Sequence, residues 1–286
     1  MRGAAGPGRG SESAHGMKTS DDLVCSNETA WNRAARDYAP QIERDVAFLS
    51  DGGVALFDVE RRLLGDLTKC RRAIHLQCSH GLDVLSLLNL GVSDVVGVDI
   101  SAEMLAQAEQ KSAWLGAPAT WVRSDVLSVP AFLDGSADLV YTGKGALPWV
   151  SDLSRWANVV RRLLRPGGRL LVFEGHPLNW MWDAGESEHR PRGDGRRYFD
   201  RRPRANDGFP AAAVVRNTPE GELAATAWEW QWTLGDVVTA VVEAELVVER
   251  LEEHPEHFWP QFDRIGDDEL RRLPHTFALL ARCPNA

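Results

Sequence analysis

The sequence predicts an α/β fold in which a mostly parallel seven-stranded sheet carries helices on both faces. From about residue 72, short apolar runs alternate with amphipathic segments of helical period, which is typical of strand–helix–strand units. The chain has 286 residues, of which 44% are hydrophobic and 26% are charged. This length and composition fit one α/β domain with insertions. We further expect an antiparallel last strand, a helical N-terminal cap and an insertion after the fifth strand.

The chain divides into segments of different composition. Residues 1–22 are rich in Gly, Ser and charge, so we expect a disordered leader, followed by a single domain over residues 23–286. Within that domain we assign four parts in chain order: a helical cap (27–67), a regular α/β core (70–175), an insertion rich in Pro, Gly and Arg (177–227), and the end of the sheet (228–283).

The first half of the core reads as strands and helices in strict alternation. We expect strands at RAIHLQC (72–78), DVVGVDI (94–100) and WVRSDV (121–126). The helix that begins with LDVLSLLNLG ends at Gly91, and the next helix begins at Ser101, a residue type that favours the N-cap position.

The second half continues this pattern around the insertion. A strand at ADLVYT (137–142) leads to the helix SDLSRWANVVRRLLRPGG (151–168) and the strand RLLVFEG (169–175). After the insertion, TAWEWQW (226–232) alternates like a strand, and Thr233 with Asp236 forms a capping box for the last helix. LVVERLEEH and HTFALLARC then complete the sheet.

Charge and cysteine usage exclude several function classes. A formal net charge of −9 argues against a nucleic-acid partner, which needs a basic face. No run approaches the roughly 18 apolar residues of a membrane span. The four cysteines form no CxxC pair and the histidines match no ligand spacing, so we expect no metal site and a cytoplasmic protein. The oligomeric state stays open.

Ligands of open α/β sheets bind beyond the carboxyl ends of the strands, which directs attention to the first turn and the next strand end. The first turn reads AIHLQCSHG (73–81) and contains one glycine, Gly81. Asp99 ends the second strand about 20 residues later, which is the spacing of an acid that binds ribose hydroxyls. Asp125 follows the third strand and is placed to face an adenine edge. Both acids also suit ordinary turn or N-cap positions.

Together these motifs resemble the class I S-adenosylmethionine-dependent methyltransferases. The resemblance covers residues 70–175 and 228–283, and it rests on GVDIS, SDV, ADLVYTGKGALPWV and RRLLRPGGRLLVFE. The first motif, usually like VLDLGCGTG, has His75 in place of an acid and Gln77 and Ser79 in place of glycines. It is similar to a bacterial subgroup with an HLQC form. The resemblance implies a Rossmann-like fold, a cofactor-binding core and the cofactor S-adenosylmethionine, with S-adenosylhomocysteine as product.

Carried over position by position, the resemblance implies a set of cofactor contacts. Asp99 holds the ribose, three residues of the first motif line the methionine side, four residues enclose the adenine, two come from the cap, and one comes from the fourth strand. The methionine side is lined by Gln77, Cys78 and Gly81, and the adenine is enclosed by Ile100, Met104, Asp125 and Val126. The cap residues are Trp31 and Tyr38, and the residue of the fourth strand is Thr142. Trp31 and Tyr38 also lie on one helix face with Ala35, so plain helix packing explains them equally well.

The catalytic and substrate-binding residues are expected around the fifth strand and the insertion. Methyl transfer requires alignment and, for some acceptors, removal of a proton, for which Glu174 and the adjacent His176 are the candidate bases. The substrate-side insertion holds seven arginines between residues 190 and 204, which suit phosphate or carboxylate unless they pair with nearby acids. For substrate contacts we select Trp180, Arg197, Arg201, Trp228 and Trp230.

These observations predict a small-molecule methyltransferase of bacterial specialised metabolism. Arginines, tryptophans and Glu174 together suit C-methylation of a prenyl diphosphate, in which case Mg²⁺ is a further cofactor. O- or N-methylation of an aromatic or amino-acid-like metabolite fits the same residues. Two rivals stay open: a non-catalytic protein that keeps the fold, favoured by the glycine-poor first turn, and a nicotinamide-dependent oxidoreductase, disfavoured by the missing GxGxxG motif.

Overall fold

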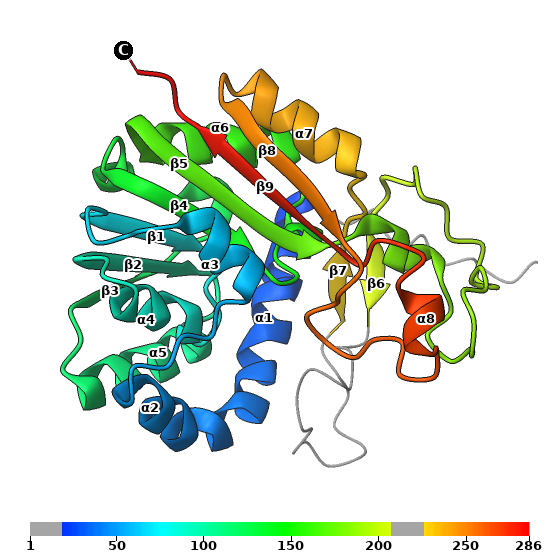
Figure 1. Ribbon diagram of the computed structural model, residues 1–286, viewed down its shortest axis with the longest axis horizontal. Helices are drawn as coiled ribbons and strands as arrows, with labels where there is room; N and C mark the ends of the chain where they lie inside the picture. Colours follow the sequence, from blue (N-terminus) through cyan, green and yellow to red (C-terminus); the bar gives the residue numbers. More distant parts are fainter. Residues whose placement is uncertain (1–18, 207–225, 286) are drawn as a thin grey trace, which may run out of the picture.

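A seven-stranded sheet of order β3-β2-β1-β4-β5-β9-β8 forms the centre of the molecule (Figure 1). The computed structural model describes residues 19–206 and 226–285. The first five strands are parallel, and β9 runs antiparallel to both of its neighbours. The predicted sheet is therefore confirmed. Its strands are β1 (Arg72–Leu76), β2 (Asp94–Asp99), β3 (Ala119–Arg123), β4 (Ala137–Gly143), β5 (Leu164–Gly175), β8 (Val247–His254) and β9 (Thr276–Arg282).

Helices cover both faces because the side chains of successive strand residues point to opposite faces. Ile74 and Leu76 of β1 pack into one core cluster with Trp156, whereas Ala73 packs into the other with Leu64. The first face carries α6 (Leu153–Leu163) and α7 (Leu234–Glu243), and the second carries α3 (Asp58–Leu64), α4 (Leu82–Asn89) and α5 (Ala102–Leu115).

The helix ends follow the expected capping chemistry. Ser101 Oγ accepts a hydrogen bond from the Met104 N–H at 3.1 Å. The Thr233 hydroxyl accepts from the Asp236 N–H at 3.1 Å, and the Asp236 carboxylate accepts from the Thr233 N–H at 2.8 Å. Both predicted caps are confirmed.

The helix before β5 ends earlier than predicted. It stops at Leu163, and Leu164 already pairs with Ala137 of β4. A residue that precedes proline is driven away from helical geometry, so Arg165 cannot extend the helix toward Pro166. Gly167 then adopts φ 76° inside the segment assigned to β5.

The N-terminal cap begins earlier than predicted. It consists of α1 (Ser20–Tyr38), the short helix η1 (Ala39–Gln41) and α2 (Ile42–Ser50). Thr19 and Asp22 form a capping box that starts α1, so the expected leader boundary at residue 22 is wrong; residues 1–18 lie outside the described residues. In Figure 1, α1 crosses the edge of the sheet where the parallel strands end.

The insertion builds a separate two-stranded sheet from β6 (Arg204–Asn206) and β7 (Ala227–Glu229). The strand expected over residues 226–232 is shorter than predicted, since only Ala227–Glu229 is a strand and it pairs with β6. Beyond Glu229 the chain turns to other partners: the Trp230 backbone N–H donates to Pro148 O at 2.7 Å, and the Trp232 indole Nε1 donates to Val150 O at 3.0 Å. Part of the predicted insertion, residues 207–225, lies outside the described residues.

Short helices complete the described chain. They are η2 (Val126–Ser128), η3 (Ala131–Leu133), η4 (Leu147–Trp149), η5 (Pro177–Met181) and α8 (Asp267–Leu270). No helix in the described part of the chain is long and apolar enough to cross a membrane.

A buried ion pair joins the cap to the core. Lys111 Nζ of α5 lies 2.9 Å from the Asp45 carboxylate of α2, and the two side chains are 0% and 3% exposed. Arg44 lies 3.5 Å from the same carboxylate, but its side chain is 73% exposed. Desolvation makes an unpaired buried charge costly, so the cap depends on Lys111 far more than on Arg44.

We predict that Lys111→Met lowers the free energy of unfolding by about 3–5 kcal/mol, because Asp45 is then left charged and buried. The control Arg44→Met, which removes a solvated partner of the same carboxylate, costs about 0–1 kcal/mol. Urea unfolding at pH 7 measures both. Recovery of most of the loss in Asp45→Leu/Lys111→Met supports this explanation, and equal costs for the two single variants contradict it.

Candidate functional site

Two cavities open at the carboxyl edge of the sheet, where the strand order reverses between β1 and β4. The first, of about 310 Å³, lies over β1, β2 and the loop after β4. The second, of about 290 Å³, lies over the end of β5. They share a wall formed by Trp31, Tyr38, Lys144, Gly145, Trp149 and Trp259.

The loop after β1 holds a left-handed backbone without glycine at two positions. Gln77 has φ 57° and Ser79 has φ 50°. Such positions cost about 1–3 kcal/mol each and persist only where surrounding contacts enforce them. Cys78 N–H donates to Val98 O at 3.0 Å, and Ser79 N–H donates to the Asp99 carboxylate at 2.7 Å. The loop therefore keeps the conformation that glycines favour while lining the first cavity with side chains.

Gln77 ties this loop to the loop after β4. Its Nε2 donates to Ala146 O at 2.9 Å, while its Oε1 is buried with no hydrogen-bond partner among the described residues. The Nδ1 atom of His75 on β1 is also buried, and it too has no hydrogen-bond partner among the described residues. Burial lowers the pKa of His75 to about 4, so this imidazole is neutral. Both residues line the first cavity, and unsatisfied buried polar atoms there are expected of a binding site.

Asp99 lies at the end of β2 and is nearly buried. Besides the Ser79 N–H, it accepts the Ser101 N–H at 2.9 Å. Burial raises the pKa of Asp99 to about 6. The Ile100 N–H acts on the same carboxylate. A carboxylate offers about four acceptor positions, so a position remains for a donor in the cavity.

The predicted adenine residues only partly line the first cavity. Ile100, Asp125 and Val126 do so together with Leu127. Asp125 also caps η2 by accepting the Leu127 N–H at 3.0 Å, which was the alternative explanation for this acid. The remaining predicted cofactor residues, Gly81, Met104 and Thr142, lie behind the lining rather than in it.

The two predicted cap residues face the cavities and also pack in the helix interface. The Trp31 ring meets Trp149 at a centroid distance of 5.1 Å, and the Tyr38 ring meets His80 at 4.6 Å. Both also pack against Ala34, Ala35 and Met104. The two interpretations of these residues are therefore compatible.

Lys144 is a residue that the sequence reasoning missed. It has φ 58°, lines both cavities, and donates from Nζ to Asp83 at 2.9 Å and to Ala55 O at 3.1 Å. The only signal for it was its place in the motif after the fourth strand.

Glu174 binds the loop after β4. Its carboxylate accepts the N–H groups of Gly145 at 2.9 Å, Ala146 at 2.6 Å, Leu147 at 3.1 Å and Gly175 at 3.2 Å. Burial raises the pKa of Glu174 to about 7. Four donors fill the acceptor positions of a carboxylate, so the charged group is already saturated by the backbone.

His176 is engaged at both ring nitrogens. Nδ1 accepts the Leu178 N–H at 3.2 Å, and Nε2 lies 2.8 Å from the Glu253 carboxylate. These contacts assign a neutral ring with the proton on Nε2 and the Nδ1 lone pair bound to the Leu178 N–H. No ring nitrogen is then free to take a proton from a methyl acceptor. His176 lines the second cavity, with its side chain 4% exposed.

His257 differs from both. It lines the second cavity, and neither of its ring nitrogens has a hydrogen-bond partner in the described part of the chain. Burial lowers its pKa, which keeps the ring neutral. Phe258 and Trp259 follow it in the cavity wall. No sequence motif marked His257.

Comparison with known proteins relates the segment around the first cavity to a known family. Residues 74–172 match the family described as a methyltransferase domain. A solved S-adenosylmethionine-dependent methyltransferase from Mesorhizobium loti is 26% identical, with a TM-score of 0.57 over 78% of this chain and 95% of that one. The chain contains an S-adenosylmethionine-dependent methyltransferase domain.

Curated relatives match the chain over part of their length. The chain is 31% identical over 137 residues to the demethylmenaquinone methyltransferase of Thermus thermophilus, covering 42% of this chain and 61% of that protein. It is 37% identical over 102 residues to the biotin biosynthesis bifunctional protein BioCD of Bordetella avium, covering 35% and 21%. The chain thus spans between 21% and 61% of the length of the curated relatives it matches.

The predicted substrate residues are scattered. Trp180 lines the second cavity, but Trp230 is buried beside a small neighbouring cavity and Trp228 lies on β7 outside both. These tryptophans do not share one strand face, because the strand ends at Glu229.

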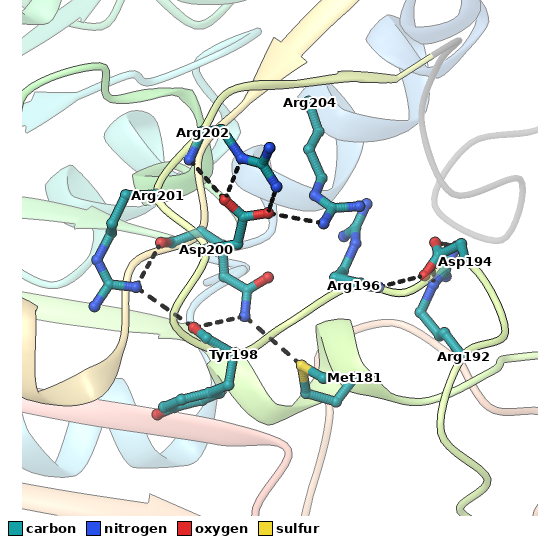
Figure 2. Close-up of polar contacts among 10 residues, drawn as sticks. Met181, Arg192, Asp194, Arg196, Tyr198, Asp200, Arg201, Arg202 and Arg204 are labelled. Atoms are coloured by element: carbon teal, nitrogen blue, oxygen red, sulfur yellow. Dashed lines mark hydrogen bonds and ion pairs between the residues drawn. The ribbon is translucent and has the colours of Figure 1, made fainter.

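The two selected arginines also lie away from the second cavity. Arg197 is exposed. Arg201 donates to the Tyr198 carbonyl at 3.4 Å (Figure 2). It also donates to the Gln231 carbonyl at 3.4 Å and pairs with Asp236. Much of the arginine segment pairs with nearby acids, which was the alternative to anion binding: Arg202 and Arg204 both contact Asp200.

The only glycine of the first motif is required by packing as well as by its backbone. Gly81 has φ 79°, and a Cβ there would lie 2.5 Å from the Trp121 ring and 2.6 Å from Ala108 Cβ. Gly116 has φ 62° but nothing within 4 Å of its Cβ position. Alanine substitution at Gly116 therefore tests backbone strain alone, whereas substitution at Gly81 tests backbone strain and overpacking together.

We predict that Gly116→Ala costs about 1–2 kcal/mol of unfolding free energy from the left-handed backbone alone. Gly81→Ala adds about 1–3 kcal/mol, because Trp121 and Ala108 must move. Denaturant unfolding of both variants measures the difference. Equal losses would show that the helix start can absorb a methyl group.

Proposed function

We propose that this chain transfers a methyl group from S-adenosylmethionine to a small molecule bound in the second cavity. When bound, the cofactor supplies a methyl group already activated by a sulfonium sulfur. The observation that carries the proposal is the shared wall between the two cavities, which places cofactor and acceptor on either side of Gly145, Trp31 and Trp149.

The residues of the first cavity fit the cofactor. Asp99 has an acceptor position for a ribose hydroxyl, and Ile100, Val126 and Leu127 offer an apolar surface for adenine. The unsatisfied Oε1 of Gln77 lies on the side of the methionine group. We also place the chain in the bacterial subgroup with the HLQC form, a placement supported by the left-handed backbone at Gln77 and Ser79.

The second cavity fits a compact, largely apolar acceptor. Trp180, Phe258 and Trp259 form aromatic walls, which favour a flat or hydrocarbon group over a polymer. We therefore infer a metabolite of specialised metabolism, either an aromatic compound methylated on O or N or an alkenyl compound methylated on carbon. Among the described residues, no group of three or more metal-binding side chains comes together, so a Mg²⁺ ion would depend on phosphate oxygens of the substrate.

For proton removal we propose His257 in place of Glu174 and His176. Its ring nitrogens carry no hydrogen bond to the described residues, whereas the other two groups are saturated. Glu174 then acts as a positioning residue that fixes residues 145–147, of which Gly145 belongs to the shared wall.

Calorimetry with S-adenosylhomocysteine tests the cofactor site. We predict that affinity falls about tenfold per pH unit below pH 6, because hydroxyl donors need the ionised Asp99 and burial raises its pKa to about 6. Asp99→Asn should bind at least tenfold more weakly at pH 7.5 and lose this pH dependence. Circular dichroism controls for folding at each pH. If the folded wild type binds neither S-adenosylmethionine nor S-adenosylhomocysteine, a non-catalytic protein is favoured. If NAD alone raises its melting temperature, an oxidoreductase is favoured.

A second prediction separates the base from the positioning residue. Release of S-adenosylhomocysteine is followed over a panel of phenols, amines and prenyl diphosphates. His257→Asn should lower turnover at least tenfold with unchanged S-adenosylhomocysteine affinity. Glu174→Gln should weaken that affinity and stability, because an amide cannot accept four N–H bonds. Loss of turnover in Glu174→Gln with full cofactor affinity would instead make Glu174 the base.

A further inference from the structure

A third hollow adjoins the second cavity on the side of the insertion. We call it the arginine hollow, after Arg192, Arg196 and Arg204 in its lining; its volume is about 560 Å³. It shares lining residues with the second cavity, so the two adjoin. The shared residues are Asn179, Trp180, Asn206, Glu229 and Gln261.

Arg196 is the arginine of this hollow that forms no ion pair within the described part of the chain. Its guanidinium lies over the Trp180 ring at 4.9 Å from the centroid. Its side chain forms no hydrogen bond or ion pair with the residues that the structure describes, and its Nε is buried. In Figure 2 the contact between Arg196 and Asp194 is made by the Arg196 backbone N–H, at 3.0 Å.

The other charges of the hollow leave an excess of positive charge. Arg192 pairs with Asp194 at 2.9 Å, and Arg204 pairs with Asp200 at 3.1 Å. Glu229 lines the hollow too, but burial raises its pKa to about 7, so near neutral pH it is partly protonated. Three guanidinium groups therefore face two full carboxylates, Asp194 and Asp200, and the partly protonated Glu229. Burial, first, and then Arg192 and Arg204 lower the pKa of Arg196, and the opposing effect of Asp194 and Glu229 is smaller.

A phosphate-type anion satisfies this arrangement best. It carries up to two charges and several acceptor oxygens, so it can bind the Arg196 fork and still reach Arg192 or Arg204. The stacking of Arg196 on Trp180 orients the guanidinium beside the aromatic wall that both spaces share.

We propose that the arginine hollow binds the phosphate or diphosphate group of the methyl acceptor, whose apolar part lies in the second cavity. This inference rests on the proposed function and narrows its acceptor to phosphorylated compounds. It also replaces Arg197 and Arg201 with Arg196 as the arginine that contacts the substrate, because only Arg196 of these three lines the hollow.

Calorimetry on the full chain with inorganic pyrophosphate and octyl diphosphate, the latter below its micelle concentration, tests the proposal. Pyrophosphate should bind the wild type and bind at least tenfold more weakly to Arg196→Ala. The neighbouring Arg197→Ala, which removes the same charge from an exposed position, should stay within twofold. Octyl diphosphate should bind at least tenfold more tightly than pyrophosphate, because its chain enters the second cavity.

Three outcomes would overturn the inference: no binding of either compound to the wild type, equal losses in the two arginine variants, or equal affinity for the two compounds. Arg196→Lys, with an intermediate loss expected, and thermal unfolding of each variant guard against a folding defect. S-adenosylhomocysteine binding, measured on the same samples, reports on the proposed function. If S-adenosylhomocysteine binds and pyrophosphate does not, only the proposal for the arginine hollow is rejected. If pyrophosphate binds and S-adenosylhomocysteine does not, the proposed cofactor site is rejected.

Discussion

The buried carboxylate of Glu174 holds together the region where the two cavities meet. Four backbone N–H groups converge on it, three of them from consecutive residues after β4. One of those residues, Gly145, belongs to the shared wall. Ala146 lines the first cavity, and its carbonyl accepts the Gln77 amide N–H from the loop after β1. A single acid thus fixes the loops of two neighbouring strands, and the arrangement tolerates its burial because the backbone supplies the charge-stabilising donors.

Local chemistry made the core of the fold predictable. Strand and helix periods gave the sheet, and short-range rules gave the caps at Ser101 and Thr233. Tertiary partners decided the rest. Residues 226–232 alternate like one strand, but Pro148 and Val150 take the hydrogen bonds beyond Glu229. Arg196 and Arg197 are identical in sequence terms, and only the path of the chain turns one toward Trp180 and the other toward solvent.

The cap and the insertion are distant in sequence but share a hydrogen-bonded contact. The Asn27 side chain donates to Trp228 O at 2.9 Å and accepts the Trp228 N–H at 2.6 Å, as a strand neighbour would. Ser26 adds a bond to Thr226 O at 2.5 Å. Through α1, the wall beside the first cavity is therefore connected to the strand pair beside the arginine hollow (Figure 1). Neither segment encodes this pairing by itself, which is why residue patterns did not reveal it.

The distribution of the four cysteines gives the protein a natural probe position. Cys25 is exposed on α1, while Cys70, Cys78 and Cys283 are buried, and burial raises the pKa of Cys70 to about 11 and that of Cys78 well above its usual range. Thiol reagents react with the thiolate form, so maleimide chemistry discriminates strongly in favour of Cys25. A fluorophore attached there sits one residue from Ser26, at the contact between α1 and the insertion, and reports opening of the cap without any engineered cysteine.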